Sequence, residues 1–125
     1  MKFKVNNEEV FASTGGRPFD SKKPLIIFVH GSGLTHMCWV LQTRSFAFHG
    51  YSVLALDLPG HGLSEGKSLQ SIEEMAEWLK DVIDTVGFKE TSLVSHSQGC
   101  LISLECAARY PEKIKTLSLM GGAGA

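Results

Sequence analysis

The sequence lacks the features that mark proteins that bind nucleic acids or membranes. Its 125 residues carry a formal net charge of −1, so there is no basic excess to attract nucleic acid or an anionic membrane surface. No apolar run approaches the length of a membrane span, and the first residues contain no apolar signal segment. We therefore expect a soluble, cytoplasmic protein without a nucleic-acid or membrane partner.

Cysteine is scarce and poorly arranged for metal binding or cross-linking. The three cysteines, Cys38, Cys100 and Cys106, are odd in number and lack the spacing of metal ligands. Cys100 and Cys106 fall six residues apart in one predicted helix and hence on different faces, which disfavours a bridge between them. We predict reduced, buried thiols and no metal site.

What is present suffices for one hydrophobic core. The composition, 43% hydrophobic and 20% charged, is ordinary for a soluble domain, and the chain is too short for two cores. Short alternating segments at Phe3–Val5 and Val10–Ala12 predict an antiparallel hairpin. Apolar runs predict buried strands of a parallel sheet, with the more alternating last one nearer an edge. These runs span residues 25–29, 52–56, 92–94 and 114–120.

The segments between these runs have helical periodicity. Ser71 and Glu74 form a capping-box pattern ahead of an apolar face, and Trp78 lies off that face, where we expect it to cover a helix flank. The predicted helices span residues 71–86, 98–110 and, with a weaker pattern, 39–48. This alternation predicts an α/β fold, a mostly parallel sheet with an N-terminal antiparallel hairpin and helices on both faces.

A serine lies where one predicted strand runs directly into a helix, in the sequence Val-Ser-His-Ser-Gln-Gly at residues 94–99. Such a turn lifts a hydroxyl clear of the sheet and points N–H groups of the helix start at a developing oxyanion. It requires small residues two positions before and after the nucleophile. Ser97 has Ser95 and Gly99 at these positions, whereas Ser95 would have Leu93, so we predict Ser97 as the nucleophile.

With this turn, three further segments and one aromatic residue make the chain resemble the N-terminal half of the α/β-hydrolase fold superfamily, in its serine hydrolase or esterase-like branch. The segments are His30–Gly33 after the first buried strand, Asp57–Ser64 after the next, and Tyr110–Ile114 before the last. Trp39 stands where the family often opens its first helix with an aromatic residue.

The resemblance implies roles for the residues around Ser97. Backbone N–H groups of Gln98 and Ser32 would form the oxyanion hole. The residues Gly31, Gly33 and His96 would line the substrate site. The implied reaction is hydrolysis of an ester, thioester or similar acyl bond of a small molecule through an acyl-enzyme, without metal or organic cofactor. A serine in place of aspartate disfavours the family's haloalkane dehalogenase and epoxide hydrolase branches.

Other polar residues near these motifs are expected to support the structure. We expect His30 to hold its loop through a hydrogen bond and Asp57 to shape the turn that follows it. His61 is interpreted as a turn residue near the mouth of the site. No role is predicted for His36 or His49.

The family's usual partners of the serine are missing. In this family an acid and then a histidine follow the nucleophile, but here only Glu105 and Glu112 follow Ser97, in positions unsuited to a triad, and no histidine does. We therefore expect residues 1–125 to be the N-terminal portion of a single α/β-hydrolase domain, without its later strands and lid. Alone it should be marginally stable and nearly inactive, ending in a loop at 121–125 after an apolar edge strand.

Two other functions are open at this point. Gly31–His36 follows a strand, and Asp57 ends the next one, as in a dinucleotide-binding unit. His36 occupies the third glycine position of that pattern, where its side chain would obstruct helix packing, which argues against this function. A non-catalytic small-molecule binder on the hydrolase fold is the other alternative.

Overall fold

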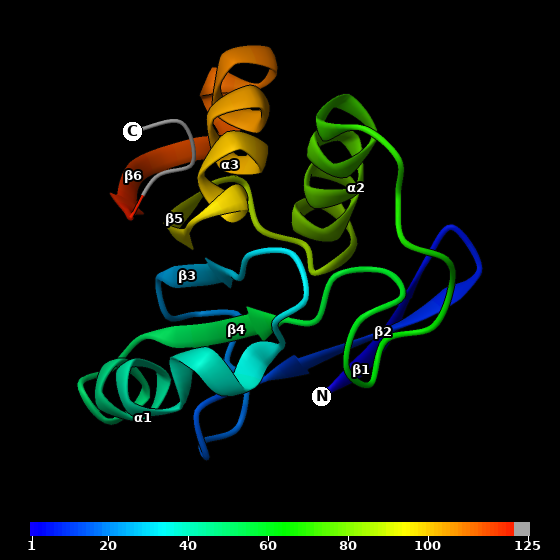
Figure 1. The fold of residues 1–125 in the computed structure, drawn as a ribbon. Helices are drawn as coiled ribbons and strands as arrows, with labels where there is room; N and C mark the ends of the chain where they lie inside the picture. The colour runs from blue at the N-terminus through cyan, green and yellow to red at the C-terminus, as the bar shows by residue number, and fades with distance from the viewer. Residues whose placement is uncertain (122–125) are drawn as a thin grey trace.

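The computed structural model describes residues 1–121 and confirms the predicted α/β architecture (Figure 1). The strands are β1 (Lys2–Val5), β2 (Glu8–Ser13), β3 (Leu25–Val29), β4 (Ser52–Leu56), β5 (Thr91–His96) and β6 (Ile114–Met120). The helices are α1 (Val40–Phe48), α2 (Ile72–Thr85) and α3 (Gln98–Arg109), with short 3₁₀ turns at His36–Trp39 and Pro111–Lys113. The part of the predicted C-terminal loop beyond Gly121 lies outside the described residues.

The strands form one sheet in the order β1-β2-β4-β3-β5-β6. The β1–β2 hairpin is antiparallel, as predicted, and joins the sheet through an antiparallel pairing of β2 with β4. The remaining neighbours, β4–β3, β3–β5 and β5–β6, are all parallel. The central strands β3 and β4 are buried along their whole length, whereas β6 forms one edge of the sheet. Parallel pairing places the loops that follow β3, β4 and β5 at one end of the sheet.

Helices cover both faces of the sheet. Helices α2 and α3 lie together on one face and α1 lies on the other (Figure 1). The larger core packs between the sheet and the α2–α3 pair, and a smaller one packs under α1 around Phe28 and Trp39. Ser71 caps α2, because its Oγ accepts a hydrogen bond of 3.1 Å from the Glu74 N–H, as its sequence pattern predicts. No helix within residues 1–121 is both long enough and apolar enough to cross a membrane.

The prediction of a buried Cys38 is wrong, and Trp78 lies in the core although the helical pattern sets it off the apolar face. Trp78 belongs to the larger core and is only 6% exposed, because the β1–β2 hairpin and residues 64–70 surround the flank of α2 that the helical pattern left open. Cys38 is exposed in the 3₁₀ turn ahead of α1 instead of buried. Cys100 and Cys106 are buried, and all three thiols are free. Burial raises the pKa of the Cys106 thiol to about 12.

Candidate functional site

Ser97 occupies a strained turn between β5 and α3. Its backbone has φ 55° and ψ −124°, a combination that residues other than glycine rarely adopt. The turn is held on both sides, since the Ser97 N–H donates to the Met120 carbonyl at 3.0 Å and its carbonyl accepts from the Cys100 N–H at 3.0 Å. Strain of this kind persists only where the surroundings enforce it, and it clusters at functional sites.

Small residues on either side permit this turn. A Cβ atom at Gly99 would collide with the carbonyl oxygens of Val29 and His30, so α3 can approach β3 only because residue 99 has no side chain. Ser95 occupies the other small position and is fully buried. Its hydroxyl lies 2.5 Å from the Ser103 hydroxyl on α3, a hydrogen bond that satisfies the extra polar group.

The loop after β3 passes directly beside Ser97. A Cβ atom at Gly31 would lie 3.1 Å from the Ser97 Cβ and 3.5 Å from its Oγ, so a side chain there would crowd the hydroxyl. Ser32 and Gln98, whose N–H groups the resemblance assigns to the oxyanion hole, together line a pocket of about 290 Å³. The structure thus brings Gly31, Ser32, Ser97 and Gln98 to one place, at the ends of β3 and β5.

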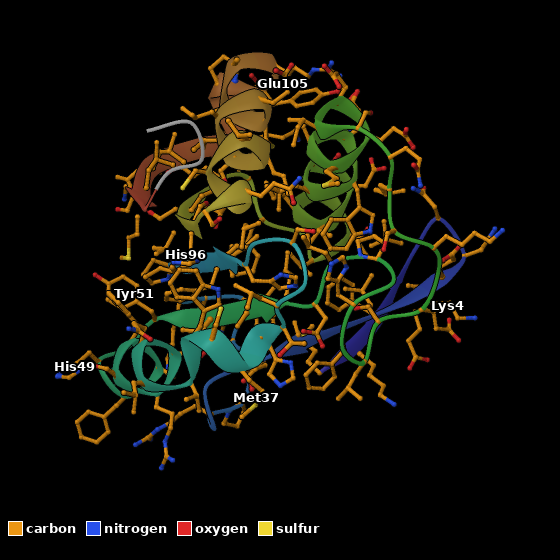
Figure 2. All side chains as sticks on the ribbon, viewed as in Figure 1. Lys4, Met37, His49, Tyr51, His96 and Glu105 are labelled. Atoms are coloured by element: carbon orange, nitrogen blue, oxygen red, sulfur yellow. The ribbon has the colours of Figure 1, made fainter. Side chains whose placement is uncertain are left out.

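The other two residues predicted to line the substrate site, Gly33 and His96, lie beside this cluster. The Gly33 N–H donates to His61 Nε2 at 3.3 Å, and this bond joins the loop after β3 to the turn after β4. His96 is exposed next to Ser97 in the chain, and its ring meets that of Trp39 edge-on at a centroid distance of 6.2 Å. In Figure 2 His96 is labelled beside β3 and above α1.

Asp57 is the anchor of the neighbouring turn. Its carboxylate is fully buried and accepts hydrogen bonds from the N–H of His36 at 2.7 Å and the N–H of Leu63 at 2.9 Å. The His36 ring nitrogen Nδ1 lies 3.0 Å from both carboxylate oxygens. A side chain at Gly62 would collide with this carboxylate. Asp57 therefore shapes the turn that follows it, as predicted, and also fixes the loop after β3.

The role of His36 was missed by sequence reasoning, although a signal for it existed. β3 and β4 are parallel neighbours, so the loops that follow them meet at the same end of the sheet. A buried acid in one loop and a histidine in the other could have been paired on that ground. The pairing also weakens the dinucleotide alternative, because the Asp57 oxygens already accept hydrogen bonds from the protein's own loops.

His30 supports the same loop as a neutral ring, as its predicted supporting role requires. It is fully buried, with Nδ1 2.6 Å from the Gly31 carbonyl oxygen and Nε2 accepting the Leu58 N–H at 3.1 Å. Because Nε2 is an acceptor, Nδ1 carries the proton and donates it. Burial is the main cause that lowers the pKa of His30 from its usual 6.5.

Within residues 1–121, the Ser97 hydroxyl makes no side-chain hydrogen bond to a histidine or a carboxylate. Glu105 instead pairs with Arg109 at 2.7 Å on the surface of α3. Glu112 is exposed in the 3₁₀ turn after that helix. Neither acid therefore approaches the turn that carries Ser97.

One protein-family model and many known proteins match this chain. A family model described as alpha/beta hydrolase fold matches residues 24–124. The (E)-2-((N-methylformamido)methylene)succinate hydrolase of Acinetobacter baylyi is 30% identical over 101 residues, which are 80% of this chain and 38% of that protein. Epoxide hydrolase 1 of Caenorhabditis elegans is 33% identical over 98 residues, 76% of this chain and 24% of that protein.

Solved structures are similar over almost the whole chain. A membrane phospholipase A described as a bacterial virulence factor superposes with a TM-score of 0.90 at 29% identity, covering 100% of this chain and 40% of that one. An epoxide hydrolase of Bacillus megaterium gives a TM-score of 0.84 at 29% identity, covering 98% of this chain and 42% of that one. The chain thus spans less than half the length of each of these relatives.

Proposed function

Because the chain belongs to the α/β-hydrolase fold family, we propose that it forms the N-terminal part of a serine hydrolase with Ser97 as the nucleophile. Proteins similar to it include hydrolases of this fold, epoxide hydrolases among them. The observation that carries the proposal is the strained backbone of Ser97, φ 55°, at a strand-to-helix turn with the loop of Gly31 beside it.

The proposed reaction is acyl transfer to the Ser97 hydroxyl. Oγ attacks the carbonyl carbon of an ester, thioester or similar acyl bond, and the carbonyl electron pair moves onto its oxygen. The N–H groups of Gln98 and Ser32 would stabilise that oxyanion. Collapse of the tetrahedral intermediate expels the alcohol or thiol and leaves an acyl-enzyme, which water then hydrolyses.

The proton of Ser97 needs an acceptor. The described residues offer no hydrogen-bonded base to Oγ, so we propose that the base and its acid partner belong to a part of the protein beyond the 125 residues. Without them, the turn and the oxyanion hole would support only weak turnover. Attack by an activated serine on an acyl carbon gives an ester that water can cleave, whereas attack on an epoxide would give a stable ether, which favours acyl substrates over the epoxides of some relatives.

The proposal is tested by trapping the acyl-enzyme. The chain is incubated for hours with excess p-nitrophenyl acetate, and the acetylated peptides are identified by mass spectrometry. We expect acetyl on Ser97 in the wild type and in Ser95→Ala, and no acetyl in that peptide of Ser97→Ala. Acetylation confined to lysines, in a chain shown to be folded, would contradict the proposal and favour a non-catalytic binder.

A further inference from the structure

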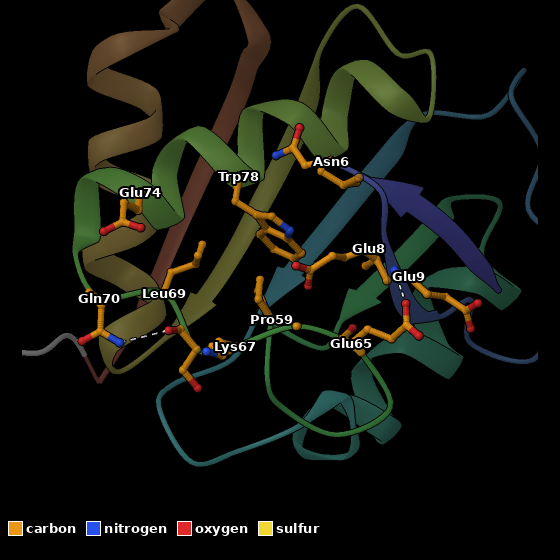
Figure 3. Close-up of a pocket in the computed structure, with 15 residues that line it drawn as sticks. Asn6, Glu8, Glu9, Pro59, Glu65, Lys67, Leu69, Gln70, Glu74 and Trp78 are labelled. Carbon is orange, nitrogen blue, oxygen red and sulfur yellow. Dashed lines mark hydrogen bonds between the residues drawn. The ribbon is translucent and has the colours of Figure 1, made fainter.

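A second cavity lies away from Ser97, between the β1–β2 hairpin, residues 59–70 and the start of α2 (Figure 3). Its volume is about 740 Å³, against about 290 Å³ for the pocket that Ser32 and Gln98 line. Neither Ser97 nor Gly31 contributes to its walls. The two cavities share only the segment that separates them, through Pro59, Ser68, Leu69 and Gln70.

The floor of this cavity is apolar and carries one free donor. Val5, Val10, Leu69 and Trp78 line it, and Figure 3 shows the Trp78 indole facing the hollow. Trp78 is 6% exposed, and its indole N–H makes no hydrogen bond within the described part of the chain. Trp39 Nε1 is the one fully enclosed side-chain polar atom without a partner among residues 1–121, so the Trp78 N–H retains some accessible surface. Figure 3 shows the indole of Trp78 at the cavity.

The rim of the cavity is acidic. Four carboxylates, those of Glu8, Glu9, Glu65 and Glu74, line it together with a single ammonium group, that of Lys67. A lining with this excess of negative charge favours a cationic ligand and repels anions.

Most of these carboxylates already have partners within the protein. Glu65 Oε1 accepts the Glu9 N–H at 2.7 Å, and Glu9 pairs with Lys2 at 3.4 Å. Glu74 Oε1 accepts from the Ser71 hydroxyl at 3.3 Å. These bonds hold three of the four acids to the chain and leave their charge at the rim.

Glu8 is the carboxylate available to a ligand. Within residues 1–121 it makes neither an ion pair nor a side-chain hydrogen bond, and Figure 3 shows it beside the Trp78 indole. A side chain at Gly66 would collide with the Glu8 carboxylate, so the glycine allows this acid to lie close against residues 65–67. A carboxylate without a partner, an indole donor and an apolar floor thus meet in one cavity.

We propose that this cavity binds a small organic ammonium compound. The cationic centre pairs with Glu8, the apolar part packs on Trp78 and Val10, and an oxygen of the ligand accepts the Trp78 N–H. A purely apolar ligand would strip water from Glu8 without replacing its hydrogen bonds, and an anion would face the acidic rim. An organic cation satisfies the charge, the donor and the apolar surface together.

Choline and its uncharged isostere 3,3-dimethylbutanol are the matched probes for the test. The chain labelled with ¹⁵N is titrated with each compound while the Trp78 indole N–H resonance is followed, with Trp78→Phe identifying that resonance. We expect a saturable shift with choline and at least fivefold weaker binding of the neutral isostere. We expect Glu8→Gln to weaken choline binding about fivefold, because it removes the carboxylate that meets the cation.

Two control variants separate this site from the global charge and from Ser97. Glu112→Gln removes one negative charge from an exposed turn, and Ser97→Ala removes the proposed nucleophile. Both should bind choline as the wild type does, whatever the outcome of the acyl-enzyme experiment. Absence of a saturable shift, equal binding of the two probes, or unchanged binding by Glu8→Gln would each overturn the proposal.

Discussion

Two turns at the same end of the sheet contrast in how their polar groups are arranged. After β4, the buried carboxylate of Asp57 accepts backbone hydrogen bonds from two loops and contacts the His36 ring. After β5, Ser97 has a strained backbone and a half-buried hydroxyl that makes no hydrogen bond to a base within residues 1–121. The first turn has the features of a scaffold, and the second has those of a reactive centre.

The difference shows how such a fold distributes stability. A buried polar group is tolerated when its hydrogen bonds are made, and those of Asp57 hold the loop that passes beside Ser97. Backbone strain of about 1–3 kcal/mol can then be carried at Ser97 because its neighbours enforce the conformation. Gly99 and Gly31 contribute by leaving room at the two places where the backbone comes closest.

The largest predicted effect comes from removing the Asp57 carboxylate. We expect Asp57→Ala to lower the free energy of unfolding by about 3 kcal/mol, since it removes a fully buried carboxylate and leaves the N–H groups of His36 and Leu63 without their acceptor. Asp81→Ala, which removes an acid paired with Lys80 on the surface of α2, should cost no more than about 0.5 kcal/mol. Urea unfolding measures both. A loss below about 1 kcal/mol for Asp57→Ala would remove the distinction between the two turns.

A pH dependence should come from His30, the other support of the loop. Because its pKa is lowered in the folded state, the unfolded chain binds a proton more readily once the pH falls below 6.5. The free energy of unfolding should therefore decrease as the pH falls from 6.5 towards the folded pKa, by no more than about 1.4 kcal/mol per pH unit.

The measurement compares wild type with His30→Gln, which cannot titrate at this position. Both proteins are unfolded with urea between about pH 7.5 and pH 5, a range that includes the ordinary histidine pKa. The difference between the two proteins isolates the contribution of His30. The stability difference between them should shrink as the pH falls. A constant difference would show that His30 does not titrate between the folded and unfolded states.

A smaller effect of opposite sign is expected at the strained turn. Ser97→Gly should raise the free energy of unfolding by about 1 kcal/mol, because glycine adopts a φ of 55° without steric cost. Ser97→Ala keeps the Cβ atom and should change stability by less than about 0.5 kcal/mol. Thermal unfolding of the two variants tests this, and equal stability would mean that the turn stores no strain.

Much of the fold could be predicted because its local signals agree with one another. β3 and β4 are continuous apolar runs buried on both faces, and Ser71 caps α2 at the expected position. The turn at Ser97 was found because a tight strand-to-helix connection demands small residues at fixed positions. The helix around residues 39–48 had a weak pattern for a physical reason, since α1 leaves Leu41 77% exposed.

What sequence could not provide were contacts between segments far apart in the chain. Trp78 is buried by the β1–β2 hairpin, some seventy residues earlier, which no helical periodicity encodes. The His36–Asp57 contact depends on β3 and β4 being neighbours, so it follows only from the topology. The cavity beside Trp78 arises in the same way, from three segments brought together by the fold.

The central claim is that the fold makes Ser97 a nucleophile, and labelling with a fluorophosphonate probe tests it most directly. The full-length protein with the proposed base, both folded and in concentrated urea, and its folded Ser97→Ala variant are exposed to excess probe, and the modified residues are identified by mass spectrometry. The account predicts labelling of Ser97 in the folded wild type alone. A folded wild type with Ser97 unlabelled, or labelled equally in urea, would contradict it.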